Sequence, residues 1–284
     1  MVVRMRLGVH VPIAGGFDKA LGWAQRTGCT TMQMFSRSPR GGRPPPIAKA
    51  AAESFDAGRR RLGIEPLAVH GPYLLNLASP EPSRWKLFAT LYREEYLRTA
   101  TLKAQYLVTH VGSHKGDGEA AGMVRVAEAV SRALEETSEG PMILLENTAG
   151  SGQGLGYQFE QLAAIRQAAT QPRRVGICLD TAHLFAAGYP IHTREGLEET
   201  LAAFDRAVGL PQLKLIHLND SKVPFGSRVD RHWHIGEGQI GLEAFRRLIN
   251  HPALQRLPFV LETPKKTEAD DVRNLAAVRA LITS

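Results

Sequence analysis

The chain has 284 residues, of which 43% are hydrophobic and 22% are charged. A chain of this length and composition can bury a full core, which excludes a protein too short or too polar to fold. We therefore expect an ordinary soluble globular protein with one domain over residues 1–284. The formal net charge of +7 favours a polyanionic partner, because lysine and arginine side chains that neutralise phosphates release condensed counterions.

The first residues and the two cysteines bear on where the protein works. Residues 1–11 alternate arginine with apolar residues and lack the uninterrupted apolar segment of a signal peptide. No apolar run elsewhere approaches membrane-spanning length, so we expect a cytoplasmic protein that does not enter a membrane. Cys29 and Cys178 lie in apolar sequence, which predicts buried thiols rather than a disulfide or metal ligands.

Short apolar runs rich in β-branched residues recur along the chain and predict eight β-strands. In chain order they cover residues 7–11, 31–35, 67–70, 106–110, 142–146, 175–180, 213–218 and 259–262. Between them, segments such as 17–24 and 197–208 carry apolar residues at three- and four-residue spacing and predict helices. This alternation predicts an α/β fold, a single-domain TIM (β/α)8 barrel. An open doubly wound sheet is the alternative, but no glycine-rich dinucleotide fingerprint follows the first strand.

Most of the predicted strands end at a side chain that can bind a metal ion. These side chains are His70, His110, Glu146, Asp180, His217 and Glu262. The carboxyl-terminal edge of a barrel is where catalytic sites are built, so we expect them to meet there. His183 follows Asp180 by three residues, and Asp230 and His232 would point to the same side of an extended segment. His10, at the end of the first strand, is expected to support ligands rather than to be one.

These nine candidates together favour a polynuclear metal site. A lone histidine at a strand end is more often a hydrogen-bonded structural residue than a ligand. Carboxylates gathered on apolar strands would each cost roughly several kcal/mol if unpaired, whereas divalent cations would compensate them. Nine ligands exceed the needs of one tetrahedral ion and could hold two or three. Imidazole and oxygen donors without thiolate suit zinc or manganese, and the many histidines favour zinc.

Three sequence blocks resemble the endonuclease IV family of apurinic/apyrimidinic (AP) endonucleases. They are residues 70–77 (HGPYLLNL), 176–183 (GICLDTAH) and 216–222 (IHLNDSK), the last running on to Asp230, Arg231 and His232. The chain departs from the family pattern at Ala182, where the family often has cysteine, and at Gly41 and Gly42, where bulkier residues are usual.

The resemblance implies a TIM barrel that holds three zinc ions at its mouth, with manganese as an alternative at one or more sites. One ion would be held by His70, His110 and Glu146, a second by Glu146, Asp180, His217 and Glu262, and the third by His183, Asp230 and His232. Glu146 would then bridge two ions. Glu262 would be a second catalytic residue, either as a ligand alone or also as the group that orients the attacking hydroxide.

The family's reaction would be hydrolysis of the phosphodiester 5' of an abasic site in duplex DNA. It leaves a 3'-hydroxyl and a 5'-deoxyribose phosphate, and trimming of blocked 3' ends is expected as a second activity. The resemblance implies that Arg40, Tyr73 and Leu74 enter the duplex at the lesion. Arg37 and the lysines that follow later strands should add positive charge around the mouth. No obligate protein partner is expected.

Two other functions remain open at this point. A sugar isomerase of similar barrel build would use one or two metal ions to polarise a carbonyl group. A noncatalytic DNA-binding protein would bind abasic duplex in a salt-sensitive way without cutting it, with its metals purely structural.

Overall fold

The structure, a computed structural model, describes residues 5–38 and 45–283. Its centre is a closed barrel of parallel strands in the order β1-β10-β7-β6-β5-β4-β3-β2, with β2 pairing back onto β1. The barrel strands are β1 (Arg6–Val11), β2 (Met32–Met34), β3 (Leu67–His70), β4 (Tyr106–His110), β5 (Met142–Glu146), β6 (Val175–Asp180), β7 (Leu213–His217) and β10 (Pro258–Leu261).

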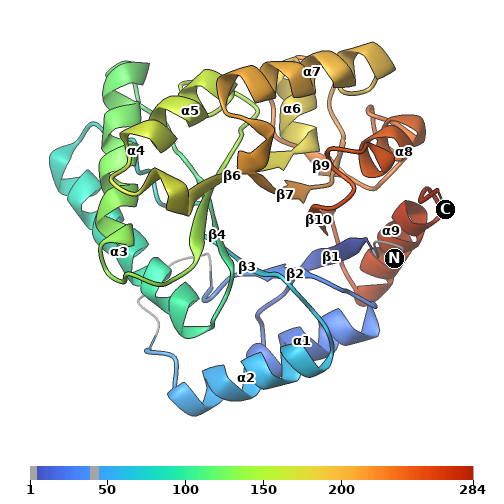
Figure 1. Ribbon diagram of the computed structural model, residues 1–284, viewed down its shortest axis with the longest axis horizontal. Coiled ribbons are helices and arrows are strands. Elements are labelled where there is room, and N and C mark those ends of the chain that lie inside the picture. The colour runs from blue at the N-terminus through green and yellow to red at the C-terminus, as the bar shows by residue number, and fades with distance from the viewer. Residues whose placement is uncertain (1–4, 39–44, 284) are drawn as a thin grey trace.

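Helices form a ring around this barrel (Figure 1). They are α1 (Phe17–Arg26), α2 (Lys49–Arg61), α3 (Pro82–Thr101), α4 (Glu119–Leu134), α5 (Phe159–Ala168), α6 (Thr181–Ala187), α7 (Arg194–Ala207), α8 (Leu242–Asn250) and α9 (Glu268–Arg279). Two short 3-10 helices, η1 (Pro172–Arg174) and η2 (Leu210–Gln212), lead into β6 and β7. Within the described ranges, no helix is both long and apolar enough to cross a membrane.

The predicted TIM barrel is confirmed, and the open doubly wound sheet is wrong because the first and last barrel strands pair with each other. All eight predicted strands are present, although β2 is shorter than expected and ends at Met34. Both predicted helical segments form, as α1 and α7. Cys29 and Cys178 are buried, as predicted.

The barrel interior carries two layers of side chains that the strand geometry sets apart. The lower one, which we call the apolar layer, is a buried cluster of Ala68, Val108, Leu144, Cys178, Leu215 and Val260. Residues i and i+2 of a strand point to the same side. The positions two residues further along the same six strands are His70, His110, Glu146, Asp180, His217 and Glu262, which we call the ionisable layer. Alternation along the strands therefore directs these six side chains inward, above an apolar floor.

A short hairpin follows β7 and is held by one buried carboxylate. It consists of β8 (Asp220–Ser221) and β9 (His232–Trp233), paired antiparallel. Asp220 accepts hydrogen bonds from the backbone N–H groups of Gly236, Gly238 and Ile240 at 2.9 to 3.0 Å. A Cβ atom on Gly238 would lie 2.5 Å from Asp220 Oδ1, so glycine is required there. This anchoring fixes the segment that carries Asp230 and His232 over the barrel mouth.

Candidate metal centre

The nine side chains that the sequence singled out converge at the carboxyl-terminal edge of the barrel. In the first group, His70 Nε2 lies 3.1 Å and His110 Nε2 lies 3.3 Å from Glu146 Oε2. Potential ligand atoms of all three residues lie within 4.8 Å of one another. One ion could therefore contact two imidazoles and one carboxylate here.

The second group shares Glu146 with the first. It contains Glu146, Asp180, His217 and Glu262, again with ligand atoms within 4.8 Å of one another. His217 Nδ1 lies 2.9 Å from Glu146 Oε1 and 3.3 Å from Glu262 Oε2. Glu146 thus presents Oε2 to the first group and Oε1 to the second, which is the geometry that a bridging carboxylate requires.

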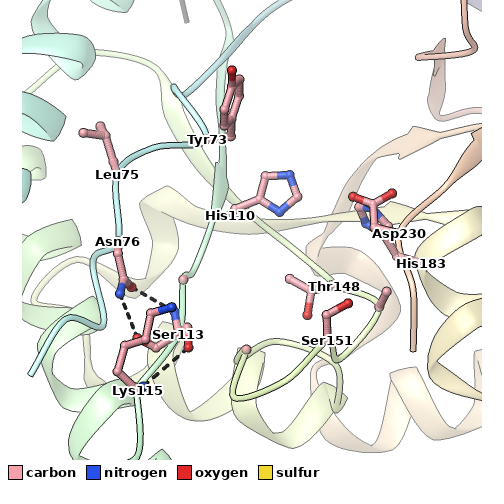
Figure 2. Close-up of a pocket in the computed structure, with 13 residues that line it drawn as sticks. Tyr73, Leu75, Asn76, His110, Ser113, Lys115, Thr148, Ser151, His183 and Asp230 are labelled. Carbon is pink, nitrogen blue, oxygen red and sulfur yellow. Dashed lines mark hydrogen bonds and ion pairs between the residues drawn. The ribbon is translucent and has the colours of Figure 1, made fainter. Parts of the chain in front are cut away.

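The third group joins α6 to the hairpin that follows β7. His183 Nε2 lies 3.2 Å from Asp230 Oδ2, and His232 Nε2 lies 3.4 Å from Asp230 Oδ1. Asp180 also belongs to this cluster, since its Oδ2 atom is 3.5 Å from His232 Nε2. Figure 2 shows Asp230 and His183 side by side, and the ring centroid of His183 lies 5.7 Å from that of His110. Asp230 is half exposed, unlike the fully buried Glu146 and Asp180.

The electrostatics of these side chains favour ionised carboxylates beside positive charge. Burial alone would raise the pKa of Glu146, but His110 and His217 outweigh it and hold that pKa well below its usual range. For His183, burial opposes the charged form, yet Asp180, Asp230 and Glu146 raise its pKa to about 10. Buried carboxylates and imidazoles without thiolate, all within ligand reach, are a donor set that fits several divalent cations.

Neighbouring amides and carbonyls hold these side chains in place, and the sequence reasoning missed the amides. Asn219 donates from Nδ2 to Asp180 Oδ2 at 2.6 Å and accepts from the Glu262 backbone N–H at 2.7 Å. Asn147 accepts from the Asp180 backbone N–H at 2.6 Å, and its own carbonyl lies 2.9 Å from His183 Nδ1. Both asparagines are fully buried. Asn147 directly follows Glu146 and Asn219 comes two residues after His217, and this closeness to predicted ligands is the sequence signal that could have identified them.

His10 lies where the sequence predicted a supporting residue. Its Nδ1 atom is 3.1 Å from Glu262 Oε1, and its ring centroid is 6.1 Å from that of His70. It belongs to none of the three groups among the described residues. His10 therefore contacts a candidate ligand without joining a candidate site.

A pocket of about 510 Å3 opens beside the clusters. Figure 2 shows His110, His183 and Asp230 on one side of it, and Asn76, Ser113 and Lys115 on another. Asn76 accepts from the Ser113 backbone N–H at 2.8 Å and donates to the Ser113 carbonyl at 2.9 Å, so this wall is rigidly tied together. The pocket joins the ionisable groups to a polar surface that carries a cation, Lys115.

Comparison with known proteins identifies the family. A family model described as a xylose isomerase-like TIM barrel matches residues 21–281. "Probable endonuclease 4" of Chloroflexus aurantiacus is 46% identical over 279 residues, which are 98% of this chain and 98% of that protein. The chain belongs to the endonuclease IV family.

Solved structures separate this family from the wider fold. The crystal structure of endonuclease IV from Thermus thermophilus superposes with a TM-score of 0.87 at 38% identity, covering 97% of this chain and 98% of that one. A D-tagatose 3-epimerase-like protein has a TM-score of 0.75 but only 19% identity over 98% and 97% of the two chains. The second likeness shows the fold alone, whereas the first lies within the endonuclease IV family.

The endonuclease IV resemblance also predicted DNA contacts, and the structure describes two of the three. Tyr73 and Leu74 follow β3 and are 58% and 52% exposed, so both side chains are accessible to a ligand at the barrel mouth. Tyr73 lines the pocket beside the clusters (Figure 2). Arg40, like Gly41 and Gly42, lies outside the described residues.

Arg37 was expected to add positive charge around the barrel mouth, but it has another role. The prediction that Arg37 adds exposed charge is wrong: its side chain is buried, with Nε 2.9 Å from Oε2 of Glu95. Glu95 is fully buried, so the pair neutralises charge inside the protein rather than presenting it to a ligand. Arg37, three residues after the end of β2, is thereby held against α3.

Proposed function

We propose that the chain is a metal-dependent AP endonuclease, a deoxyribonuclease IV. It hydrolyses the phosphodiester 5' of an abasic site in duplex DNA and leaves a 3'-hydroxyl and a 5'-deoxyribose phosphate. The observation that carries this proposal is the convergence of nine predicted ligands into three neighbouring groups, on a chain that matches a "Probable endonuclease 4" over 98% of its length. Trimming of blocked 3' ends is proposed as a second activity of the same site.

We propose three zinc ions for these groups, with manganese possible at one or more of them. The first would be held by His70, His110 and Glu146, the second by Glu146, Asp180, His217 and Glu262, and the third by His183, Asp230 and His232. Bound divalent cations would activate water near neutral pH and neutralise charge on phosphoryl oxygens.

The two glutamates of the ionisable layer differ in exposure and are proposed to have different roles. Glu146 is fully buried and keeps the first two groups together through its two oxygens. Glu262 has a 16% exposed side chain, so it alone among the glutamates of the ionisable layer can also face the substrate. With Oε1 held by neighbouring side chains, Glu262 presents Oε2 to a ligand and can orient the attacking water as well.

The substrate contacts follow from the exposed surface of the mouth. A nucleotide without a base is cheaper to turn out of the duplex, because no stacking is lost at that position. Tyr73 and Leu74 are proposed to enter the duplex at this point, together with Arg40. Lys115 and the serines of the pocket wall are placed to contact the phosphodiester backbone.

We further propose that residues 1–284 act on DNA as one domain in the cytoplasm, without an obligate protein partner. All nine proposed ligands come from this chain and already lie within reach of one another. Assembly of the site therefore requires no residue from a second molecule.

The decisive experiment incubates the purified protein with a duplex that carries an abasic analogue, with and without a chelator. We expect cutting 5' of the lesion, loss of cutting with chelator, and its return when zinc is added. Glu262→Gln should retain metal yet lose activity by more than about 100-fold. Loss of a residue that only supports a ligand reduces activity by up to about 100-fold, and Glu262 is proposed to contact the metal group directly. Glu268→Gln is the matched control, since Glu268 pairs with Arg26 at the surface.

Three results would count against the proposal. Cutting that persists in chelator would exclude the metal mechanism. Undiminished cutting by Glu262→Gln would remove that residue from it. Turnover of ketoses or aldoses, with no cutting of DNA and only one or two metal ions per chain, would favour the sugar isomerase.

A further inference from the structure

Gln33 is a polar residue in the middle of the shortest barrel strand, β2, and its side chain is fully buried. It lies between the methionines Met32 and Met34, which are also buried and show that this strand can be packed with apolar side chains of similar size. A buried amide costs free energy unless its hydrogen-bonding groups are paired. The partners of Gln33 therefore explain why an amide stands here.

Both ends of this amide contact the second metal group. Gln33 Oε1 lies 2.8 Å from His217 Nε2, and Gln33 Nε2 donates to Glu262 Oε1 at 2.6 Å. The same NH2 group lies 2.9 Å from His10 Nδ1. An amide is a neutral side chain that accepts on one atom and donates twice from the other. Only with the carbonyl facing His217 does the NH2 group face the Glu262 carboxylate, which accepts and cannot donate when ionised.

These contacts determine what His217 and Glu262 present to the centre of the group. Gln33 Oε1 can only accept, so it fixes a proton on Nε2 of His217 and leaves Nδ1 as the nitrogen that could give a lone pair to a metal ion. Nδ1 is the atom that faces Glu146 Oε1 at 2.9 Å and Glu262 Oε2 at 3.3 Å. Because Gln33 binds Oε1 of Glu262, Oε2 is the oxygen that faces the centre of the group, 3.3 Å from His217 Nδ1.

We infer that Gln33 is a positioning residue that sets the tautomer of His217 and the orientation of Glu262, and through them the metal affinity and turnover of the site. The inference rests on the proposed function for its turnover part only. Gln33 itself does not touch DNA, because its side chain is fully buried beneath the mouth. Its effect must therefore appear in metal binding and kcat rather than in KM for the duplex.

Two substitutions separate the roles of the two ends. Gln33→Met fills a similar volume and removes the contacts with His217, Glu262 and His10. Gln33→Glu keeps an acceptor for His217 but replaces the donor to Glu262 with a like charge. The matched control is Gln105→Met, because Gln105 also uses Oε1 to accept a hydrogen bond, from the Leu67 backbone N–H at 2.8 Å, at the opposite end of β3.

Metal affinity is measured by competition with a chromophoric zinc chelator, and kcat and KM are measured on the abasic duplex. For Gln33→Met we expect zinc affinity and kcat each to fall by about 10- to 100-fold, the range for loss of an outer-shell partner, with KM unchanged. For Gln33→Glu we expect retained zinc and a fall of kcat alone. Gln105→Met should match the wild-type protein in all three quantities.

Wild-type zinc affinity and kcat in Gln33→Met would overturn the inference. If Gln33→Met does not fold, as judged by thermal unfolding, Gln33→Glu decides, and wild-type kcat in that variant overturns it. A wild-type protein that binds zinc but cuts no abasic duplex would contradict the proposed function instead. Zinc competition with Gln33→Met would then still test the positioning role.

Discussion

The apolar layer lies on six strands and the ionisable layer lies two residues further along the same chain segments, yet the two layers are stabilised in opposite ways. Leu144 and Glu146, for example, are both fully buried on β5. Leu144 packs against apolar neighbours and gains free energy on burial. Glu146 loses hydration and must be compensated by His70, His110 and His217.

This difference separates stability from function inside one barrel. The barrel strands fix the Cα positions of both layers, so packing in the apolar layer also holds the backbone of the ionisable layer in place. Substitution in the ionisable layer should therefore remove metal and activity, whereas substitution in the apolar layer should lower the free energy of unfolding and leave the chemistry intact.

The largest effect is expected for Glu146→Gln. The change preserves shape but removes the charge that two metal groups share, so we expect the metal content to fall and kcat on abasic duplex to drop by more than about 100-fold. Elemental analysis and an incision assay measure the two quantities. Glu128→Gln, at a surface pair with Arg132, is the control. Full metal content in Glu146→Gln would show that this carboxylate is not a shared ligand.

The next effect is expected one layer below, for Leu144→Ala. A large-to-small change at a fully buried position should lower the free energy of unfolding by roughly 2 to 5 kcal/mol. Metal content and kcat, measured well below the unfolding temperature, should stay at wild-type values. Urea denaturation gives the first quantity, with Leu97→Ala at an exposed position of α3 as the control. A loss of metal without a loss of stability would contradict the separation of the two layers.

Much of this comparison could be predicted from the sequence. A run such as residues 142–146, four apolar residues ending in Glu146, indicates both a buried strand and a ligand at its end. The three-group arrangement was implied by resemblance, and the structure brings those residues together, adding Asp180 to the third group. The apolar runs identify the buried strands, and the C-terminal ends of parallel barrel strands all meet at one edge of the barrel.

The contacts of Gln33 and Arg37, unlike the supporting role of His10, could not be predicted, for a physical reason. Gln33 lies in an apolar run on β2, and only the barrel closure brings it to His217 on β7 and Glu262 after β10. Arg37 looks like an exposed cation in a basic loop, but its partner Glu95 comes from the C-terminal half of α3, 58 residues further along the chain. The two partners of each such contact are far apart in the sequence, so no local pattern in a single sequence predicts that they meet.

The smallest effect is expected outside both layers, at Leu74. Its side chain is 52% exposed after β3, so Leu74→Ala should change the free energy of unfolding by less than about 0.5 kcal/mol. If Leu74 enters the duplex, its loss should raise KM for abasic duplex by roughly 5-fold, equivalent to about 1 kcal/mol of binding, with metal content unchanged.

Leu87→Ala provides a closely matched control, because Leu87 is 55% exposed on α3 and is the same residue type. Steady-state kinetics on an abasic duplex and on an intact duplex compare the two variants. An equal rise of KM in both would mean that general loss of surface apolar area, and not entry into the lesion, causes the effect. A rise for Leu74→Ala alone would add a third region to the comparison: one that supplies recognition with little contribution to stability or metal binding, because it is held by neither layer.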